Sequence, residues 1–312
     1  MFGTTLTLCL YGGTAAAALC LIAGMAAWWL PCLELANDVR PFTLAGTGVL
    51  LATSVAIGDR RLMLIDAVIL ASTLILFLLP FVFVARWKKG ETPTLRIVTF
   101  NIEATNTRYR DIIDFIADVN PDLVLIQEID AAGAADLARG FGSSYMHMFQ
   151  VGRTRNVGLA LFSRHPCIES GAVDRTESKP GVIWAQVCRK ALIFDVMNVY
   201  LADPFHPNEQ SRHIEWLIDH VCARVRPLIV AGDFNLTPFS AKLAKFSLAT
   251  GLKRHGTLLA SWPADKFRPV FLIDNVFTSP EFCSAKVRAG PFLGSDHRPI
   301  IADIVSRGVV PS

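Results

Sequence analysis

Three long runs without a charged residue occupy most of the first 85 residues. The first charged side chain is Glu34. The uncharged runs cover residues 7–30, 41–58 and 67–85. A helix that crosses a bilayer needs about 20 mainly apolar residues, so each run is long enough to form one. We therefore predict a membrane region over residues 1–85, with transmembrane helices at about 7–30, 41–58 and 62–85.

Two other structures fit such runs: a helix buried in a protein core and, for the first run, a signal peptide. A signal peptide begins with basic residues and has a shorter apolar segment, whereas residues 1–6 contain no Lys or Arg. We therefore favour three membrane spans. Asp66 lies about one turn inside the third span. We expect it near the bilayer surface beside Arg60 and Arg61, although an acid inside a span is also a candidate functional group.

The basic residues around the spans bear on orientation. The short loop after the second span contains Arg60 and Arg61, and the positive-inside rule places such a loop in the cytoplasm. With three spans, the rest of the chain then lies outside. Arg86, Lys88 and Lys89 after the third span argue for the opposite orientation. We favour a multi-pass protein of the cell membrane whose C-terminal domain is extracytoplasmic.

The charge balance says which partners the C-terminal part suits. Residues 1–85 contain three arginines and four acidic residues, so the rest of this chain of net charge +3 carries +4. A domain dedicated to duplex DNA usually has a stronger basic footprint. Charge therefore does not favour nucleic acid. The seven cysteines form no CxxC pair, so neither a zinc site nor a disulfide framework follows.

Beyond a charged linker at residues 86–94, segments typical of strands and helices alternate over residues 95–306. The predicted helices cover residues 110–119, 131–139 and 209–224. The predicted strands cover residues 95–100, 122–128, 158–163, 182–187, 191–201, 228–231, 272–278 and 299–305. Some strands, such as 228–231, are apolar on both faces and need a covering layer on each side, whereas residues 96–100 alternate in part. Two packed sheets with helices outside satisfy both patterns.

Acids and amides follow several of the apolar strands. Glu128 directly follows one buried strand and points into the cleft that the strand ends define. Asp233 and Asn235 flank Phe234 after another. Residues i and i+2 of an extended segment face the same way, so a carboxylate and an amide converge there. The same pattern also fits a turn in which both residues cap their own backbone. Asn101 ends the first strand.

Asp296 and His297 form an acid–imidazole pair before the last strand. A His with a carboxylate partner is held in one tautomer and is protonated more easily, and Asp274 is the candidate partner. An isolated Asp-His pair also fits an ordinary loop. Phosphoester hydrolysis needs a cation on the phosphate oxygens, a base for water, and donors that hold the phosphate in line. Mg²⁺ prefers carboxylate oxygens, so this set of residues points to that chemistry.

The joint order of these residues resembles the endonuclease/exonuclease/phosphatase superfamily of DNase I-like and AP endonuclease-like metal-dependent phosphoesterases, in its bacterial membrane-anchored type. The matching segments are TFNI at 99–102, PDLVLIQE at 121–128, NVYLADP at 198–204, GDFN at 232–235, IDNVF at 273–277 and GSDHRPI at 294–300. The resemblance implies an α+β fold with a four-layer αββα sandwich, a site at one end of it, and Mg²⁺ or Mn²⁺ as cofactor.

The resemblance also implies which residues hold the metal. Glu128 is similar to the principal ligand, with Asp296 and Asn101 beside it. Asn101 is also placed to donate to the phosphate. Glu103, two residues after Asn101, is a candidate second metal ligand, but it stands where some members of the superfamily have an Asp, which puts that role in doubt.

Catalytic roles are implied for a second set of residues. His297 and Asp274 match the superfamily's His–Asp pair. Asp233 matches the acid that orients water, and Asn235 matches the amide that binds phosphate. Tyr200 stands where many members have a His and others a Tyr that contacts phosphate. We expect Tyr200 to fill that role here.

These features predict a membrane-anchored Mg²⁺-dependent phosphoesterase that hydrolyses a phosphodiester, phosphomonoester or pyrophosphate bond by in-line attack of water. Its predicted partners are the lipid bilayer and a phosphate-containing substrate, either a lipid-linked phosphate or nucleic acid, and no protein partner is predicted. A membrane-tethered nuclease that acts on DNA is the first alternative. A catalytically inactive phosphate- or lipid-binding module is the second. The surface loops that select a substrate have no predictable shape.

Overall fold

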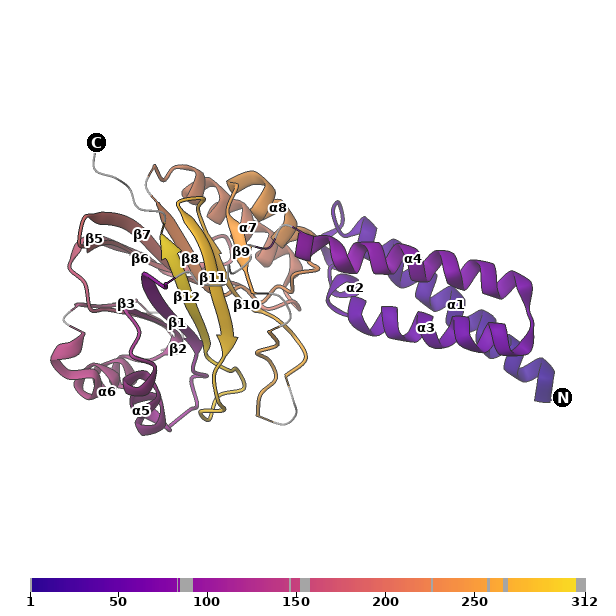
Figure 1. Cartoon of the computed structure of the whole chain (residues 1–312), viewed down its shortest axis with the longest axis horizontal. Coiled ribbons are helices and arrows are strands. Elements are labelled where there is room, and N and C mark those ends of the chain that lie inside the picture. Colours follow the sequence, from indigo (N-terminus) through magenta and orange to yellow (C-terminus); the bar gives the residue numbers. More distant parts are fainter. Residues whose placement is uncertain are drawn as a thin grey trace. The chain divides into compact units, whose positions relative to one another are not determined.

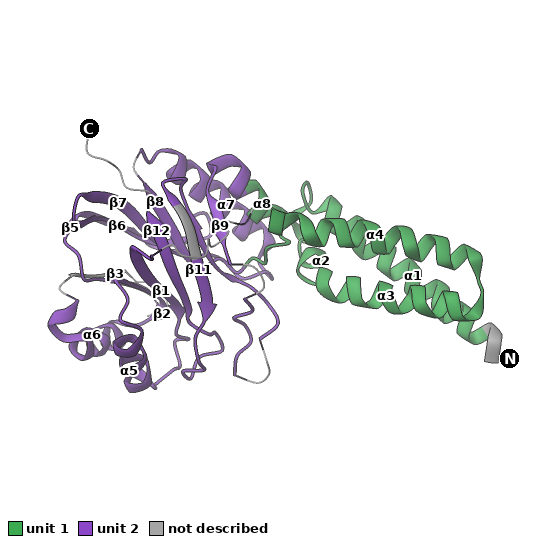
Figure 2. Ribbon diagram, viewed as in Figure 1, with its two compact units in different colours: residues 1–83, 236–245 green, residues 84–235, 246–312 purple. Residues whose placement is uncertain are grey.

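The structure, a computed structural model, describes residues 2–82, 84, 92–145, 147–151, 158–225, 227–256, 259–265 and 269–306. The chain forms two compact units, which Figure 2 colours separately. One comprises Met1–Phe83 with Leu236–Lys245, and the other comprises Val84–Asn235 with Phe246–Ser312. Residues 86–91 of the predicted linker lie outside the described residues.

The first unit is a bundle of three long helices. They are α1 (Phe2–Ala26), α3 (Arg40–Ile57) and α4 (Arg60–Val82), with the short η1 (Pro31–Leu33) and α2 (Leu35–Asp38) between the first two. The segments Thr5–Ala26, Arg40–Ile57 and Arg60–Val82 are long and apolar enough to cross a membrane. Large apolar side chains such as Leu19, Val68 and Ile75 are exposed on the bundle, as a lipid-facing surface requires.

Polar contacts lie inside this bundle. Asp66 is buried within the bundle, and it accepts a 2.7 Å hydrogen bond from the Thr14 hydroxyl. Pro80 lies within α4 and lacks an N–H, so the Leu76 carbonyl loses its helical partner. The Arg40 guanidinium donates to that carbonyl at 3.1 Å. Both contacts give partners to polar groups in the interior of the bundle.

The second unit contains two six-stranded sheets (Figure 1). The first sheet has, in spatial order, β11 (Phe282–Ala289), β12 (Ile300–Ser306), β1 (Leu95–Asn101), β2 (Leu123–Ile129), β4 (Gly158–Ser163) and β3 (His147–Val151). The second has β5 (Cys167–Val173), β6 (Gly181–Arg189), β7 (Leu192–Tyr200), β8 (Leu228–Asp233), β10 (Asp274–Thr278) and β9 (Lys253–His255). The pairs β1–β2 and β7–β8 are parallel, so their carboxyl ends coincide.

The two sheets pack face to face and helices cover their outer sides. Residues from both sheets, such as Leu125 and Val196, belong to one buried cluster. On the outer face of the first sheet lie α5 (Tyr109–Val119) and α6 (Ala131–Phe141), the latter followed by η2 (Gly142–Ser144). On the side of the second sheet lie α7 (Pro207–Cys222) and α8 (Ala241–Thr250), as Figure 1 shows. This confirms the predicted four-layer αββα sandwich.

Gly232 allows β7 and β8 to approach closely just before the polar residues at the end of β8. Its φ is +151°, and a Cβ there would lie 2.0 Å from the Val199 carbonyl oxygen. We expect Gly232→Ala to destabilise the protein by about 3 kcal/mol or more, because it combines backbone strain with a clash against backbone. Thermal unfolding measures this.

Gly251→Ala is the matched control. Gly251 also has a positive φ, +69°, but nothing lies within 4 Å of its added Cβ. It should lose only about 1 kcal/mol. Equal losses in the two variants would show that the close approach to Val199 is unimportant.

Candidate active site

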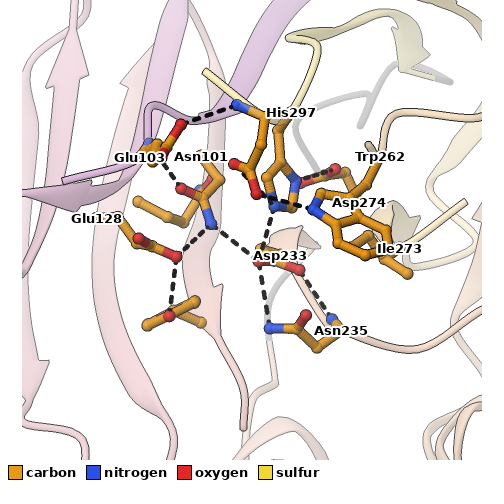
Figure 3. Close-up of polar contacts among 12 residues, drawn as sticks. Asn101, Glu103, Glu128, Asp233, Asn235, Trp262, Ile273, Asp274 and His297 are labelled. Carbon is orange, nitrogen blue, oxygen red and sulfur yellow. Dashed lines mark hydrogen bonds and ion pairs between the residues drawn. The ribbon is translucent and has the colours of Figure 1, made fainter. Parts of the chain in front are cut away.

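The ends of five strands bring the predicted polar residues to one end of the sandwich (Figure 3). In the first sheet, Asn101 pairs with Gln127 across β1 and β2, which places it beside Glu128. In the second sheet, Asp233 lies opposite Tyr200 on β7 and opposite Asp274 on β10. The last predicted residues, Asp296 and His297, precede β12.

Asn101 connects the two sheets at this end. Its Nδ2 donates to Glu128 Oε1 at 2.8 Å and to Asp233 Oδ2 at 3.0 Å. The Tyr200 hydroxyl donates to the same Glu128 oxygen at 2.9 Å. Burial, reinforced by the negative charge of Glu128, raises the pKa of Tyr200, so the phenol stays protonated and remains a donor. Glu128 is therefore held by two neutral donors.

His297 forms the predicted pair with Asp274. Its Nδ1 lies 2.9 Å from Asp274 Oδ2, and both side chains are buried. The other ring nitrogen, Nε2, lies 3.9 Å from Asp233 Oδ2 and 3.9 Å from Asp296 Oδ1. A proton on Nδ1 that is donated to Asp274 leaves Nε2 facing Asp233 and Asp296.

Three carboxylates lie near the His297 imidazole and favour its protonated form. Burial alone lowers the pKa of His297, but the charges of Asp274 and Asp233 outweigh burial and raise it above its usual range. Burial raises the pKa of Asp233, opposed by His297 and reinforced by Asp274 directly across the ladder. A protonated His297 between the two acids relieves the repulsion that two opposed carboxylates produce.

Asp233 and Asn235 also form a turn that caps its own backbone. Both predictions for this motif, the converging acid and amide and the capped turn, are therefore met. The Asn235 N–H donates to Asp233 Oδ1 at 2.8 Å, and Asn235 Nδ2 donates to the Leu201 carbonyl at 3.2 Å. Asn235, Glu128 and Glu103 have φ values of 51°, 56° and 59°. Such strained backbone in residues other than glycine concentrates at functional sites.

Residues outside the eight predicted site residues hold Asp296 and His297 in place. The Trp262 indole donates to Asp296 Oδ2 at 2.8 Å, and Glu103 Oε2 accepts the Asp296 N–H at 3.1 Å. Ser295 donates to the Asn101 carbonyl at 2.7 Å and accepts the His297 N–H at 2.9 Å. Glu103 thus acts on a backbone amide, a role for which its position in the sequence contains no signal.

Among the described residues, one group of donors lies close enough together to hold a metal ion. Ligand atoms of Asp233, Asp274 and His297 lie within 4.8 Å of one another, and two of these residues also bond each other through His297 Nδ1 and Asp274 Oδ2. Glu128 and Asp296, the ligands that the resemblance implies, carry hard carboxylate oxygens of the kind that Mg²⁺ or Mn²⁺ prefers. Asn101 turns its Oδ1 toward the Glu103 N–H at 3.0 Å, so its predicted metal role depends on the second lone pair of that oxygen.

Other histidines lie outside this cluster. His165 pairs with Asp122 at 2.6 Å. His206 is exposed and contacts Asp203. The structure therefore brings together all eight predicted site residues, which are Asn101, Glu128, Tyr200, Asp233, Asn235, Asp274, Asp296 and His297.

Residues 98–297 match the model of the Endonuclease/Exonuclease/phosphatase family. No curated protein matches the chain. Solved structures with the same fold include an endonuclease/exonuclease/phosphatase from Bacteroides vulgatus, 22% identical, with a TM-score of 0.58 over 68% of this chain and 99% of that one. Another is D. rerio TDP2 complexed with a single-strand DNA product, 19% identical, with a TM-score of 0.58 over 68% and 99%. A third is a Bacteroides thetaiotaomicron mannosyl-6-phosphatase, 17% identical, with a TM-score of 0.56 over 68% and 100%.

Proposed function

Because this chain belongs to the endonuclease/exonuclease/phosphatase family, we propose that it is a membrane-anchored, Mg²⁺-dependent phosphoesterase. It is a hydrolase that acts on phosphoester bonds. The observation that carries the finer proposal is the cluster in which His297 bonds Asp274, faces Asp233, and lies beside the Asn101–Glu128 pair. We assign residues 1–85 to the membrane region, 86–94 to a linker and 95–306 to the catalytic domain.

The proposed roles follow from the donor and acceptor geometry. Glu128 and Asp296, with Asn101, hold a divalent cation that neutralises charge on the phosphate oxygens. Asp233 accepts hydrogen bonds from two amides and orients the attacking water. His297, fixed by Asp274, stabilises charge in the transition state while its ring is protonated, and it acts as base only after losing that proton.

Tyr200 and Asn235 supply the donors that hold the phosphate, together with Asn101. In the structure the Tyr200 hydroxyl donates to Glu128 and Asn235 Nδ2 donates to Leu201 and Asp233, so each must leave one of these partners to donate to a phosphate. These donors sit on two different sheets, so a phosphate bound there is contacted from both sides. This arrangement suits in-line attack, which needs the phosphate held in one orientation.

Two alternatives differ in substrate or in class. A DNA-directed nuclease is supported by the fold that the chain shares with D. rerio TDP2 complexed with a DNA product, and it is opposed by the modest charge of the C-terminal part. An inactive phosphate- or lipid-binding module has the same fold but needs no ordered cluster of His and acids. We favour a phosphoester on a membrane lipid, because the three membrane spans proposed here would tether the domain to a bilayer.

A substrate panel with purified full-length protein and Mg²⁺ separates these proposals. The panel contains plasmid DNA, abasic duplex, sphingomyelin, inositol phosphates and a prenyl pyrophosphate. We expect hydrolysis of a lipid-linked or small phosphoester to exceed hydrolysis of either DNA. Faster cleavage of DNA would establish the nuclease instead, and no turnover of any substrate together with tight phosphate binding would establish the binding module.

We also propose that the catalytic domain lies outside the cytoplasm, from the Arg60–Arg61 loop and the three spans. Alkaline phosphatase fused to the C-terminus in a bacterial host should be active, because its disulfides form only outside the cytoplasm. A green fluorescent protein fused at the same place should be dark. The reverse pattern would place the domain in the cytoplasm.

A further inference from the structure

The catalytic turn continues directly into a segment that belongs to the helical unit. Asp233 and Asn235 end β8, and Leu236–Lys245 follows without a break. Figure 2 shows this segment in the colour of the three-helix bundle. Within that unit, its contacts include two hydrogen bonds and an aromatic cluster. Each involves either the connection between α1 and α3 or the end of α4.

The first contact joins Thr237 to Asp38. The Thr237 hydroxyl donates to Asp38 Oδ1 at 2.7 Å, and the two residues are 2% and 7% exposed. Burial raises the pKa of Asp38 to about 6, opposed by this hydrogen bond and by the charge of Lys242 and reinforced by Glu34. At neutral pH the carboxylate is therefore ionised, and a hydrogen bond to it is stronger than one between neutral groups.

The second contact caps α8. Ala241 is the first residue of that helix, and its N–H donates to Glu34 Oε1 at 2.8 Å. A carboxylate at a helix N-terminus satisfies an otherwise free donor and complements the helix dipole. Glu34 is 2% exposed. A residue between two membrane spans thus serves as the cap of a helix about 200 positions later in the chain.

The third contact is aromatic. The Phe239 ring stacks on Phe77 with centroids 5.1 Å apart, and it meets Phe81 edge-on at 5.9 Å. Both partners lie on α4, on either side of Pro80. Phe239 is 4% exposed. Such pairs contribute about 0.5–1.5 kcal/mol beyond the area they bury, so the segment is held by packing as well as by hydrogen bonds.

On the N-terminal side of Leu236, hydrogen bonds of Asn235 hold the catalytic turn. The Asn235 N–H bonds Asp233, and the Asn235 carbonyl accepts from Gln210 Nε2 at 2.8 Å. One residue separates Asn235 from Thr237, and a chain spans at most about 3.6 Å per residue. Only the torsions of Leu236 separate a displacement of Thr237 from Asn235, and the φ of 51° at Asn235 leaves the turn little freedom.

We propose that the membrane bundle is part of the catalytic machinery and not only an anchor: Asp38, Glu34 and Thr237 are positioning residues that act on Asp233 and Asn235 through Leu236–Lys245. The proposal rests on the function proposed above for that turn. It implies that the membrane region can regulate catalysis, since a change in the bundle at Glu34 or Asp38 alters the catalytic turn. These acids are not merely surface charges of a loop.

The test compares Thr237→Val with Thr53→Val in full-length protein in detergent. Valine keeps the shape of threonine and removes the hydroxyl, and Thr53 donates only within its own helix in the bonds described, to the Val49 carbonyl. With bis(p-nitrophenyl) phosphate and Mg²⁺, Thr237→Val should lower kcat on the order of 10- to 100-fold with KM within about twofold. Thr53→Val should match the wild type.

A double-mutant cycle with Asn235→Ala distinguishes positioning from general damage. If Thr237 acts through Asn235, Thr237→Val should change kcat little once Asn235 is absent. An equal fold-loss in both backgrounds, or wild-type kcat in Thr237→Val, would overturn the proposal. Asp38→Asn, which keeps an acceptor for Thr237 but loses the charge, should fall between wild type and Thr237→Val.

Hydrogen exchange keeps the proposal testable without catalysis. The Asn235 amide is bonded to Asp233, so it should exchange slowly in the wild type and faster in Thr237→Val, with Thr53→Val unchanged. Should the wild type hydrolyse nothing, the proposed function fails and exchange alone decides the positioning role. Unchanged protection of Asn235 in Thr237→Val would refute it.

Discussion

Replacement of His297 by alanine is expected to lower phosphoester hydrolysis by the full-length protein by about 100- to 10,000-fold, the range for loss of a general acid or base. The imidazole lies between Asp274 at 2.9 Å and Asp233 at 3.9 Å, so no neighbouring donor replaces it. Asp233→Asn should cause a loss of the same order, because it removes the charge that orients water while preserving the size of the side chain.

The loss must occur in folded protein. Thermal unfolding and circular dichroism should show both variants folded. His220→Ala is the matched control, since His220 is exposed on α7 and its ring stacks on Trp216. It should retain wild-type kcat. A rate near wild type in His297→Ala or Asp233→Asn would refute the catalytic assignment.

The second large effect concerns the metal. Saturating Mg²⁺ should raise the melting temperature of the wild type by roughly 5–10 °C, as a ligand at about 100 times its Kd stabilises a domain of this size. Glu128→Gln should abolish most of this shift and lower kcat by about 100-fold or more. The substitution removes a carboxylate charge and leaves a side chain of the same size beside Asn101 and Tyr200.

Glu169→Gln on β5 is the control for this experiment, because Glu169 is exposed and lies on the strand at one edge of the second sheet. It should show the full Mg²⁺ shift. A shift of equal size in Glu128→Gln would contradict the assignment of Glu128 as the principal metal ligand. No shift in the wild type would instead favour the inactive binding module.

Much of the sandwich was predictable because its central strands are mainly apolar. Residues 95–100, 122–128 and 228–231 form β1, β2 and β8, nearly as expected. The strands that sequence reasoning missed are polar or lie at sheet edges. For example, β5 reads CIESGAV and is largely exposed or half-buried, and β11 contains Lys286 and Arg288. Such segments lack the apolar pattern on which the prediction depends.

The residues of the site were predictable, as was the contact between His297 and Asp274, but most of the other contacts were not. Strand ends located Asp233 and Asp274, and their direct opposition across β8 and β10 required the observed register. The positive φ of Glu128 arises at an irregularity in the pairing of β2 with β4, which no residue pattern signals. Neither did the sequence indicate that Glu34 and Asp38 bind the segment after the catalytic turn, because that contact joins positions far apart in the chain.

The most direct measurement is the rate of phosphoester hydrolysis by full-length protein that has been stripped of metal with a chelator, as Mg²⁺ is added back. We expect no turnover without the cation, a saturable rise in wild-type turnover as Mg²⁺ is added, and no rise in His297→Ala. Turnover that is independent of the cation, or an equal rise in His297→Ala, would contradict a cation-dependent phosphoesterase site built from Glu128, Asp233 and His297.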